Sequence, residues 1–266
     1  MTFAYARRYR GPLRAVVLDW AGTVVDFGCL APAGAFIEAF RRHGVDITLE
    51  QARGPMGTPK RDHIKAVAAM PPVAAAWEAR HGAAVTEADI DAIYATFMPL
   101  QVAVVENYAG LIPGALEAVA ALRARGLKIG STTGYPRPVM EVVLAAAARQ
   151  GYVPDACVCA GETPSGRPGP AMALKCLIEL DVHPVEACVK IGDTVVDVEE
   201  GLNAGMWTIA LVDCGNEVGL PFEQWSALSP AEQAKRRAPA ADKLARAGAH
   251  YVVGALSEVQ PVLDDI

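Results

Sequence analysis

Short apolar runs that end at polar residues alternate with helical patterns along most of the chain. The first run, Ala15–Leu18, is β-branched, stops at Asp19 and predicts a buried parallel strand. Further runs predict strands at Lys128–Ser131, Ala156–Cys159, Ala187–Ile191, Trp207–Leu211 and His250–Val253. Helical patterns separate them at Ala115–Arg125, Pro138–Gln150, Pro170–Leu180, Asp197–Ala204 and, more polar, Phe222–Gly248. This alternation predicts an α/β fold with a doubly wound, Rossmann-like parallel sheet.

The segment that follows the first strand has a different pattern. It contains almost no β-branched runs and predicts helices at Pro32–His43, Pro59–Ala69, Pro72–Arg80 and Glu87–Leu100, with Gly and Pro turn signals between them. An all-helical insert after strand one is placed to cover the carboxyl edge of the sheet. We therefore expect a core domain of residues 1–27 and 106–266 and a helical cap domain of residues 28–105.

Composition narrows the class of protein. The chain has 266 residues, 52% of them hydrophobic, and a mean hydropathy of +0.23, which allow a substantial core. A net charge of −6 gives no support to nucleic-acid binding. Six cysteines without a CxxC pair are typical of reduced thiols. The first 14 residues lack an apolar signal core, and no stretch approaches the ~20 apolar residues of a membrane span. We expect a soluble cytoplasmic protein without membrane contact.

Four predicted strands or their loops carry polar side chains at the carboxyl ends. They are Asp19, the Ser131–Tyr135 segment, Arg167 in the loop after the third strand, and the Gly192–Asp197 segment. Because parallel strands end at one edge of a sheet, we expect these groups to lie together. Hydroxyls and N–H groups opening a helix after Ser131 suit a phosphoryl oxygen, and the planar guanidinium suits phosphate. Taken singly, each is an ordinary cap or turn residue.

The stretch Asp19-Trp20-Ala21-Gly22-Thr23 resembles the first motif of the haloacid dehalogenase superfamily, whose first aspartate attacks phosphorus. Phosphatases of this type carry a second aspartate two residues later, as the acid for the leaving oxygen, where this chain has Ala21. A carboxylate attacking a dianionic group needs charge neutralisation, so we expect Asp19 and Asp193 to share Mg²⁺. Ala21 contributes only its carbonyl. Asp197 is better placed to orient metal-bound water or Asp193.

A second candidate group lies in the predicted cap. Thr58 is a good N-cap and Pro59 a good first helical residue, which places Lys60 in the first turn. The positive end of the helix dipole lowers the pKa of an amine there, which suits an amine that must be neutral to attack a carbonyl. His63 follows on the same face and could shuttle a proton. The residues alone leave non-catalytic interpretations open, in which Lys60 is a solvated surface residue, His63 is a capping or partly buried polar residue and Met56 belongs to the core.

Five segments together resemble the phosphonoacetaldehyde hydrolase (phosphonatase) family of this superfamily, from about Leu13 to the C-terminus. They are DWAGTVVDFGC, RGPMGTPKRDH, GSTTGYPR, SGRPGP and IGDTVVDVEEGLNAGMWT. The chain departs from the family pattern after Arg167, where Gly169 and Ala171 replace bulkier residues. That change loosens local packing and removes no chemical group.

The resemblance implies a role for each site residue. Asp19 is the nucleophile, Lys60 forms a Schiff base with the substrate aldehyde, and Asp193 and the Ala21 carbonyl hold Mg²⁺. The phosphonate is bound by Thr133 and Arg167, and Gly134, next to Thr133, also belongs to the substrate-binding residues. The imine is surrounded by Met56, His63, Tyr135 and Cys29. Members of the family are homodimers, which implies a dimer formed through the cap and a small-molecule phosphonate as substrate.

The absence of an acid at position 21 is consistent with cleavage of a P–C bond. When a P–C bond of an aldehyde phosphonate breaks, the leaving group is a carbanion, and a protonated imine on Lys60 provides the electron sink that it needs. An acid at position 21 would have no leaving oxygen to protonate. Two alternatives remain: a phosphate-ester phosphatase or phosphosugar mutase, which predicts an acid at position 21, and a non-catalytic binding protein, which predicts loss of Asp19, Asp193 or Arg167.

Overall fold

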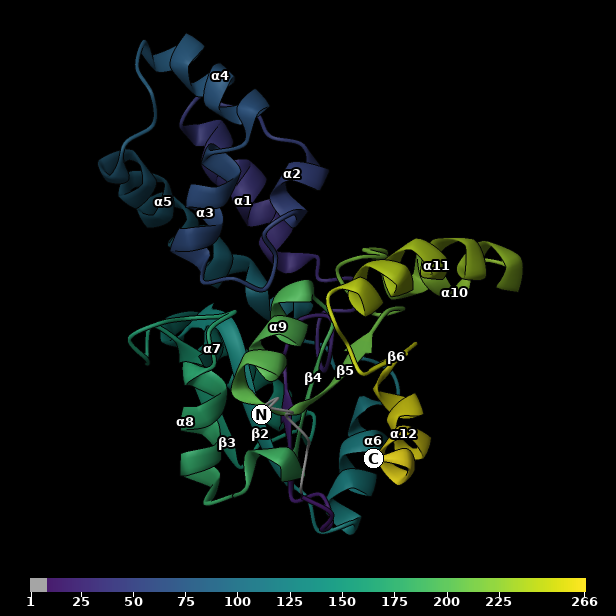
Figure 1. Ribbon diagram of the computed structural model, residues 1–266. Helices are drawn as coiled ribbons and strands as arrows, with labels where there is room; N and C mark the ends of the chain where they lie inside the picture. Colours follow the sequence, from purple (N-terminus) through teal and green to yellow (C-terminus); the bar gives the residue numbers. More distant parts are fainter. Residues whose placement is uncertain (1–8) are drawn as a thin grey trace, which may run out of the picture.

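A parallel sheet forms the centre of the computed structural model, which describes residues 9–266. Residues 1–8, part of the predicted core domain and of the segment searched for a signal, lie outside the described residues. All strand pairs are parallel, in the order β3-β2-β1-β4-β5-β6 (Figure 1). The strands are β1 Ala15–Leu18, β2 Lys128–Pro136, β3 Ala156–Ala160, β4 Cys188–Gly192, β5 Trp207–Leu211 and β6 Tyr251–Val253. The predicted doubly wound α/β fold is confirmed.

Helices cover both faces of this sheet. They are α6 Ala115–Ala124, α7 Arg137–Arg149, α8 Ala171–Leu180, α9 Val195–Ala204, α10 Phe222–Ser226, α11 Pro230–Arg246 and α12 Val259–Asp265, with short 3-10 turns at Glu106–Tyr108, Val185–Ala187 and Leu256–Glu258. On β1, Val16 and Leu18 face the cluster formed with α6, α7 and α12, whereas Ala15 and Val17 face α8. Every residue of β1 is buried, which explains its unbroken apolar run.

Five helices form a separate bundle above the carboxyl edge of the sheet (Figure 1). They are α1 Ala31–Arg42, α2 Leu49–Arg53, α3 Lys60–Ala68, α4 Pro71–His81 and α5 Glu87–Val105. The bundle has its own apolar core, which includes Phe36, Phe40, Ile64, Trp77 and Phe97. We call this bundle the cap; its predicted limits at residues 28 and 105 stay predictions.

Three local expectations were wrong. The short helix α2 was not predicted; its signal is a capping box, in which the Thr48 hydroxyl accepts the Gln51 N–H and the Gln51 side chain accepts the Thr48 N–H. Helix α5 runs through Pro99 to Val105 and does not end at Leu100. Strand β2 continues to Pro136 through a bulge in its pairing with β3, so Ser131–Tyr135 is strand and does not open the helix.

Helix α5 also corrects the expectation about membrane segments. Among the described residues, Glu87–Tyr108 has the length and apolar composition that a membrane span needs, with a hydropathy of 1.3. A single helix of this kind is weak evidence for a span, because the core helix of a soluble protein passes the same test. Here Ile90, Ile93 and Phe97 of the helix pack into the core of the cap.

Candidate active site

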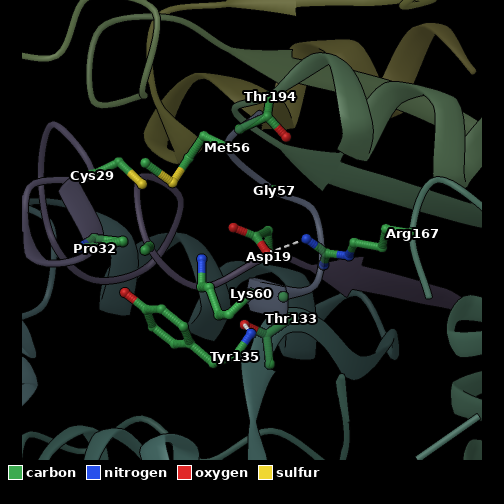
Figure 2. Close-up of a pocket in the computed structure, with 12 residues that line it drawn as sticks. Asp19, Cys29, Pro32, Met56, Gly57, Lys60, Thr133, Tyr135, Arg167 and Thr194 are labelled. Carbon is green, nitrogen blue, oxygen red and sulfur yellow. Dashed lines mark hydrogen bonds and ion pairs between the residues drawn. The ribbon is translucent and has the colours of Figure 1, made fainter. Parts of the chain in front are cut away.

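A narrow pocket lies between the cap and the carboxyl ends of β1 and β2 (Figure 2). It is lined by Asp19, Ala21, Cys29, Pro32, Met56, Gly57, Lys60, Thr133, Gly134, Tyr135, Arg167 and Thr194. The sheet register explains the grouping, because Leu18 pairs with Ser131 of β2 on one side and Ile191 of β4 on the other. The next residues of all three strands therefore meet at one place.

Asp19 is held at the floor of the pocket by Arg167. The Arg167 Nη1 donates to the Asp19 Oδ1 at 2.7 Å, the contact drawn as a dashed line in Figure 2. Burial and the charge of Asp197 raise the pKa of Asp19 to about 6, against the lowering effect of the guanidinium. A positioned carboxylate with little solvent around it is suited to attack an electrophile that enters the pocket.

Behind Asp19 lies a buried polar network that the sequence did not reveal. Glu200 forms ion pairs with both cations: its Oε2 lies 2.9 Å from the Arg167 Nε and 3.1 Å from the Lys190 Nζ. The Thr132 hydroxyl donates to Glu200 at 2.9 Å. The same hydroxyl oxygen accepts from the Lys190 amine at 3.0 Å and from the Arg167 Nη2 at 2.6 Å. All four side chains are almost completely buried, so the network fixes the guanidinium in one orientation.

Two further acids complete the carboxylate cluster. Asp193, at the end of β4, and Asp197, on α9, each place one oxygen within 4.8 Å of Asp19 and of each other. Burial raises the pKa of Asp193 well above its usual range, and the charges of Asp19 and Asp197 add to the rise. For Asp197, burial is outweighed by Arg167 and Lys190, which lower its pKa to about 2.

This cluster fits a hard divalent cation. The four carboxylates of the cluster outnumber its two cations, Arg167 and Lys190, and only Asp19, Asp197 and Glu200 pair with them. Asp193 has no ion-pair partner among the described residues, and its Oδ2 accepts the Asn216 N–H at 2.7 Å. Asp197 already binds Arg167, Lys190 and the N-cap Thr194. The three aspartates together could hold a metal ion, and oxygen ligands are those that Mg²⁺ prefers.

Lys60 reaches the same pocket from the cap and points toward Asp19 (Figure 2). Its amine lies 4.9 Å from the ring centre of Tyr135 and 5.5 Å from that of Phe36. Only 4% of the residue is exposed. Burial lowers its pKa to about 8, even though the charges of Cys29 and Asp19 raise it. The lowered pKa was predicted, but desolvation is its main cause, which the helix-terminus argument did not include.

The start of α3 differs by one residue from the expectation. The helix begins at Lys60, with Pro59 in the cap position, and Thr58 is not the N-cap. The Thr58 hydroxyl instead donates to the Pro55 carbonyl at 2.7 Å, which closes the preceding turn. Lys60 still lies in the first turn, as predicted.

His63 lies inside the cap and does not line the pocket. Its Nε2 donates to the Ala52 carbonyl at 2.8 Å, and its ring stacks on Phe36 with centres 3.8 Å apart. Burial and the nearby charge of Lys60 lower the pKa of His63 well below its usual range, so the ring is neutral. Its Nδ1 has no hydrogen-bond partner among the described residues.

Comparison with known proteins identifies the family. The family model for haloacid dehalogenase-like hydrolases matches residues 13–205. A phosphonoacetaldehyde hydrolase of Aeromonas hydrophila subsp. hydrophila is 52% identical over 256 residues, which cover 96% of this chain and 92% of that protein. The chain belongs to the phosphonoacetaldehyde hydrolase family. It is therefore a hydrolase of the haloacid dehalogenase superfamily, as the motifs predicted.

Other members of the phosphonoacetaldehyde hydrolase family match over similar lengths. The one from Klebsiella pneumoniae subsp. pneumoniae is also 52% identical, over 96% of this chain and 95% of that protein. A crystal structure of a phosphonoacetaldehyde hydrolase-like protein from Oleispira antarctica superposes with a TM-score of 0.95 at 44% identity. That alignment covers 99% of this chain and 96% of the other. The fold is thus shared over nearly the whole length.

The fold brings together most of the residues that the phosphonoacetaldehyde hydrolase resemblance implied. Nine of them line the pocket: Asp19, Ala21, Cys29, Met56, Lys60, Thr133, Gly134, Tyr135 and Arg167. Asp193 and Asp197 lie buried beside Asp19, and His63 lies farther inside the cap. The residues missed are Pro32 and Gly57 of the pocket lining and Thr132, Lys190 and Glu200 of the buried network. A lysine inside the apolar run of β4 was the one signal that could have revealed the network.

Proposed function

We propose that this enzyme hydrolyses the carbon–phosphorus bond of phosphonoacetaldehyde to acetaldehyde and phosphate. The observation that carries the proposal is the buried amine of Lys60, with a pKa of about 8, in the same pocket as Asp19. Ala21 lines that pocket where an ester phosphatase needs its general acid. The names of the relatives support the same substrate.

In the proposed mechanism, neutral Lys60 attacks the aldehyde carbon, and uptake of one proton with loss of water gives a protonated imine; the proton is returned when the imine is hydrolysed at the end. Asp19 then attacks phosphorus, and the electron pair of the P–C bond moves into the imine to form an enamine on Lys60. Water hydrolyses the aspartyl phosphate and releases phosphate. The enamine takes a proton on carbon, and hydrolysis of the resulting imine releases acetaldehyde and restores the amine.

Other pocket residues have supporting roles in the proposal. Arg167 and Thr133 hold phosphonate oxygens. Gly134 allows the cap to approach β2 closely, since a Cβ at that position would lie 2.7 Å from the Thr58 carbonyl oxygen of the cap. Cys29, Met56 and Tyr135 surround the imine carbon chain. His63, held neutral, assists proton transfer near Lys60. Asp19, Asp193 and the Ala21 carbonyl hold Mg²⁺, which neutralises charge on the phosphoryl group when bound, and Asp197 orients the surrounding ligands.

We infer that the enzyme is a cytoplasmic homodimer that pairs through the cap. Only 28% of the apolar stretch in α5 is buried within one chain, which leaves an apolar face for a second cap. All six cysteines, which lie within residues 9–266, are free thiols, as expected in a reducing compartment.

Phosphate release tests the proposed function. With phosphonoacetaldehyde and Mg²⁺ we expect steady phosphate production, and removal of the metal with EDTA is expected to reduce it by at least about 100-fold, with recovery on adding Mg²⁺. A generic phosphomonoester is the matched control substrate and is expected to react far more slowly. Faster turnover of the ester, or equal rates with and without metal, would contradict the proposal.

The pH dependence of imine formation provides a second test. A lysine with a lowered pKa is charged and unreactive below that pKa and neutral above it. Because the pKa of Lys60 is about 8, the rate at low substrate is expected to fall about tenfold per pH unit below pH 8 and to level off above it. Borohydride trapping during a single turnover measures this rate. A rate that continues to rise through about pH 10, as for an exposed lysine, would exclude a depressed pKa.

A further inference from the structure

The loop after β5, residues 213–220, contacts both the carboxylate cluster and the cap. Its Asn216 N–H donates to the Asp193 Oδ2 at 2.7 Å, and Asn216 is 6% exposed. Its Cys214 carbonyl accepts the N–H of Gly28, in the segment that leads from β1 into the cap, at 2.8 Å. One loop thus orients a proposed metal ligand and holds one of the two connections between cap and core.

Arg53, the last residue of α2, joins the cap to this same loop. Its Nη1 donates to the Asn216 carbonyl at 2.9 Å and its Nη2 to the Gly219 carbonyl at 3.1 Å. The Asn216 side-chain amide donates to the Arg53 carbonyl at 3.5 Å, a longer return contact. Gly219 has a positive φ of 64°, and a Cβ there would lie 2.1 Å from the Arg53 Nη1. The Arg53 guanidinium can therefore lie this close to the loop only because residue 219 is a glycine.

The position of Arg53 in the chain links it to the reactive amine. Six residues lie between it and Lys60, and the loop that they form contacts the core. A Cβ at Gly57 would lie 2.5 Å from the Thr194 Oγ1, and one at Gly166 would lie 2.3 Å from the Pro59 Cγ. Residues 54–59 thus pack against core segments on two sides. Arg53 anchors the N-terminal end of this loop, and Lys60 follows its C-terminal end.

We propose that Arg53 is a positioning residue that couples closure of the cap to the orientation of Asp193. Its two hydrogen bonds fix the loop that carries Asn216, and Asn216 in turn fixes Asp193, while the same helix end begins the loop that leads to Lys60. Arg53 is half-buried, so water can replace these bonds if the cap moves away from the core, at small net cost. This inference rests on the proposed function for its kinetic consequences, whereas the loop contacts can be tested without substrate.

The experiment compares Arg53→Ala and Arg53→Lys with Arg41→Ala as a matched control. Arg41 also lies on the cap, but its side chain is exposed and pairs only with Glu38 of its own helix among the described residues. Arg53→Ala is expected to lower kcat/KM for phosphonoacetaldehyde by about 10- to 100-fold and to raise the Mg²⁺ concentration for half activation several-fold. Arg53→Lys, which can reach one carbonyl, is expected to recover part of the loss, and Arg41→Ala to match wild type.

Hydrogen exchange of residues 213–220, in metal-free protein without substrate, is the independent readout. Faster exchange in Arg53→Ala, but not in Arg41→Ala, with an unchanged melting temperature supports the coupling. Unchanged exchange and an unchanged Mg²⁺ requirement would overturn it, even if activity falls. If wild type releases no phosphate from phosphonoacetaldehyde, the proposed function fails, and the exchange measurement still decides the role of Arg53.

Discussion

Replacing Lys60 with arginine is expected to reduce phosphate release from phosphonoacetaldehyde on the order of 10⁴-fold, because arginine keeps the charge but cannot form an imine. Without the imine, the electrons of the breaking P–C bond have no acceptor. Phosphate release under saturating Mg²⁺ measures the loss. Borohydride with substrate is expected to label Lys60 in wild type and to leave the Lys60→Arg protein without label at that position.

The control for this experiment lies on the same helix. Lys65 is exposed and pairs with Glu87 at 2.5 Å, so Lys65→Arg changes a lysine of α3 without reaching the pocket. That variant is expected to retain wild-type activity and labelling. Label on a lysine other than Lys60, or near-normal turnover by Lys60→Arg, would show that the reaction does not use this amine.

The sequence predicted the positions of Asp19 and Asp193 well, for a topological reason. Asp19 directly follows an apolar run and Asp193 lies two residues after the end of another, and parallel strands deliver the residues after such runs to one edge of the sheet. Lys60 was found from different information, since a lysine in a helix start next to a Gly-Pro-rich loop is an unfavourable choice for stability. Its approach to Asp19 required tertiary structure, because the cap and the core meet only after folding.

The buried polar network behind Asp19 could not be predicted from the sequence. Thr132 and Thr133 are neighbours in one strand and point to opposite sides, and nothing in the sequence shows that Thr132 contacts Glu200 while Thr133 lines the pocket. Glu200 lies in a predicted helix and nothing in the sequence marks it as buried, yet it is completely buried. The contribution of burial to the pKa of Lys60 was invisible for the same reason, since desolvation depends on side chains from distant segments.

Replacing Asp19 with asparagine is expected to abolish phosphate release to a similar extent, on the order of 10⁴-fold or more, because an amide cannot accept the phosphoryl group. The protein is expected to stay folded. Burial raises the pKa of Asp19 to about 6, so the ionised side chain destabilises the metal-free fold above that pH, and a neutral amide removes this cost. The melting temperature of metal-free Asp19→Asn at pH 7.5 is expected to equal or exceed that of wild type. Asp46→Asn, at an exposed position of the cap, is the control and is expected to change neither quantity.

The two variants are expected to fail at different steps, and this difference tests the order of the reaction. Asp19→Asn retains Lys60, so borohydride with phosphonoacetaldehyde is expected to label Lys60 in that variant although no phosphate appears. Lys60→Arg is expected to show neither label nor phosphate. If Asp19→Asn also loses the label, while its fold and the pKa of Lys60 are unchanged, then imine formation needs the carboxylate and cannot precede phosphoryl transfer independently. Retained label without phosphate places the electron sink before the nucleophilic attack, which is the order that an alanine at position 21 requires.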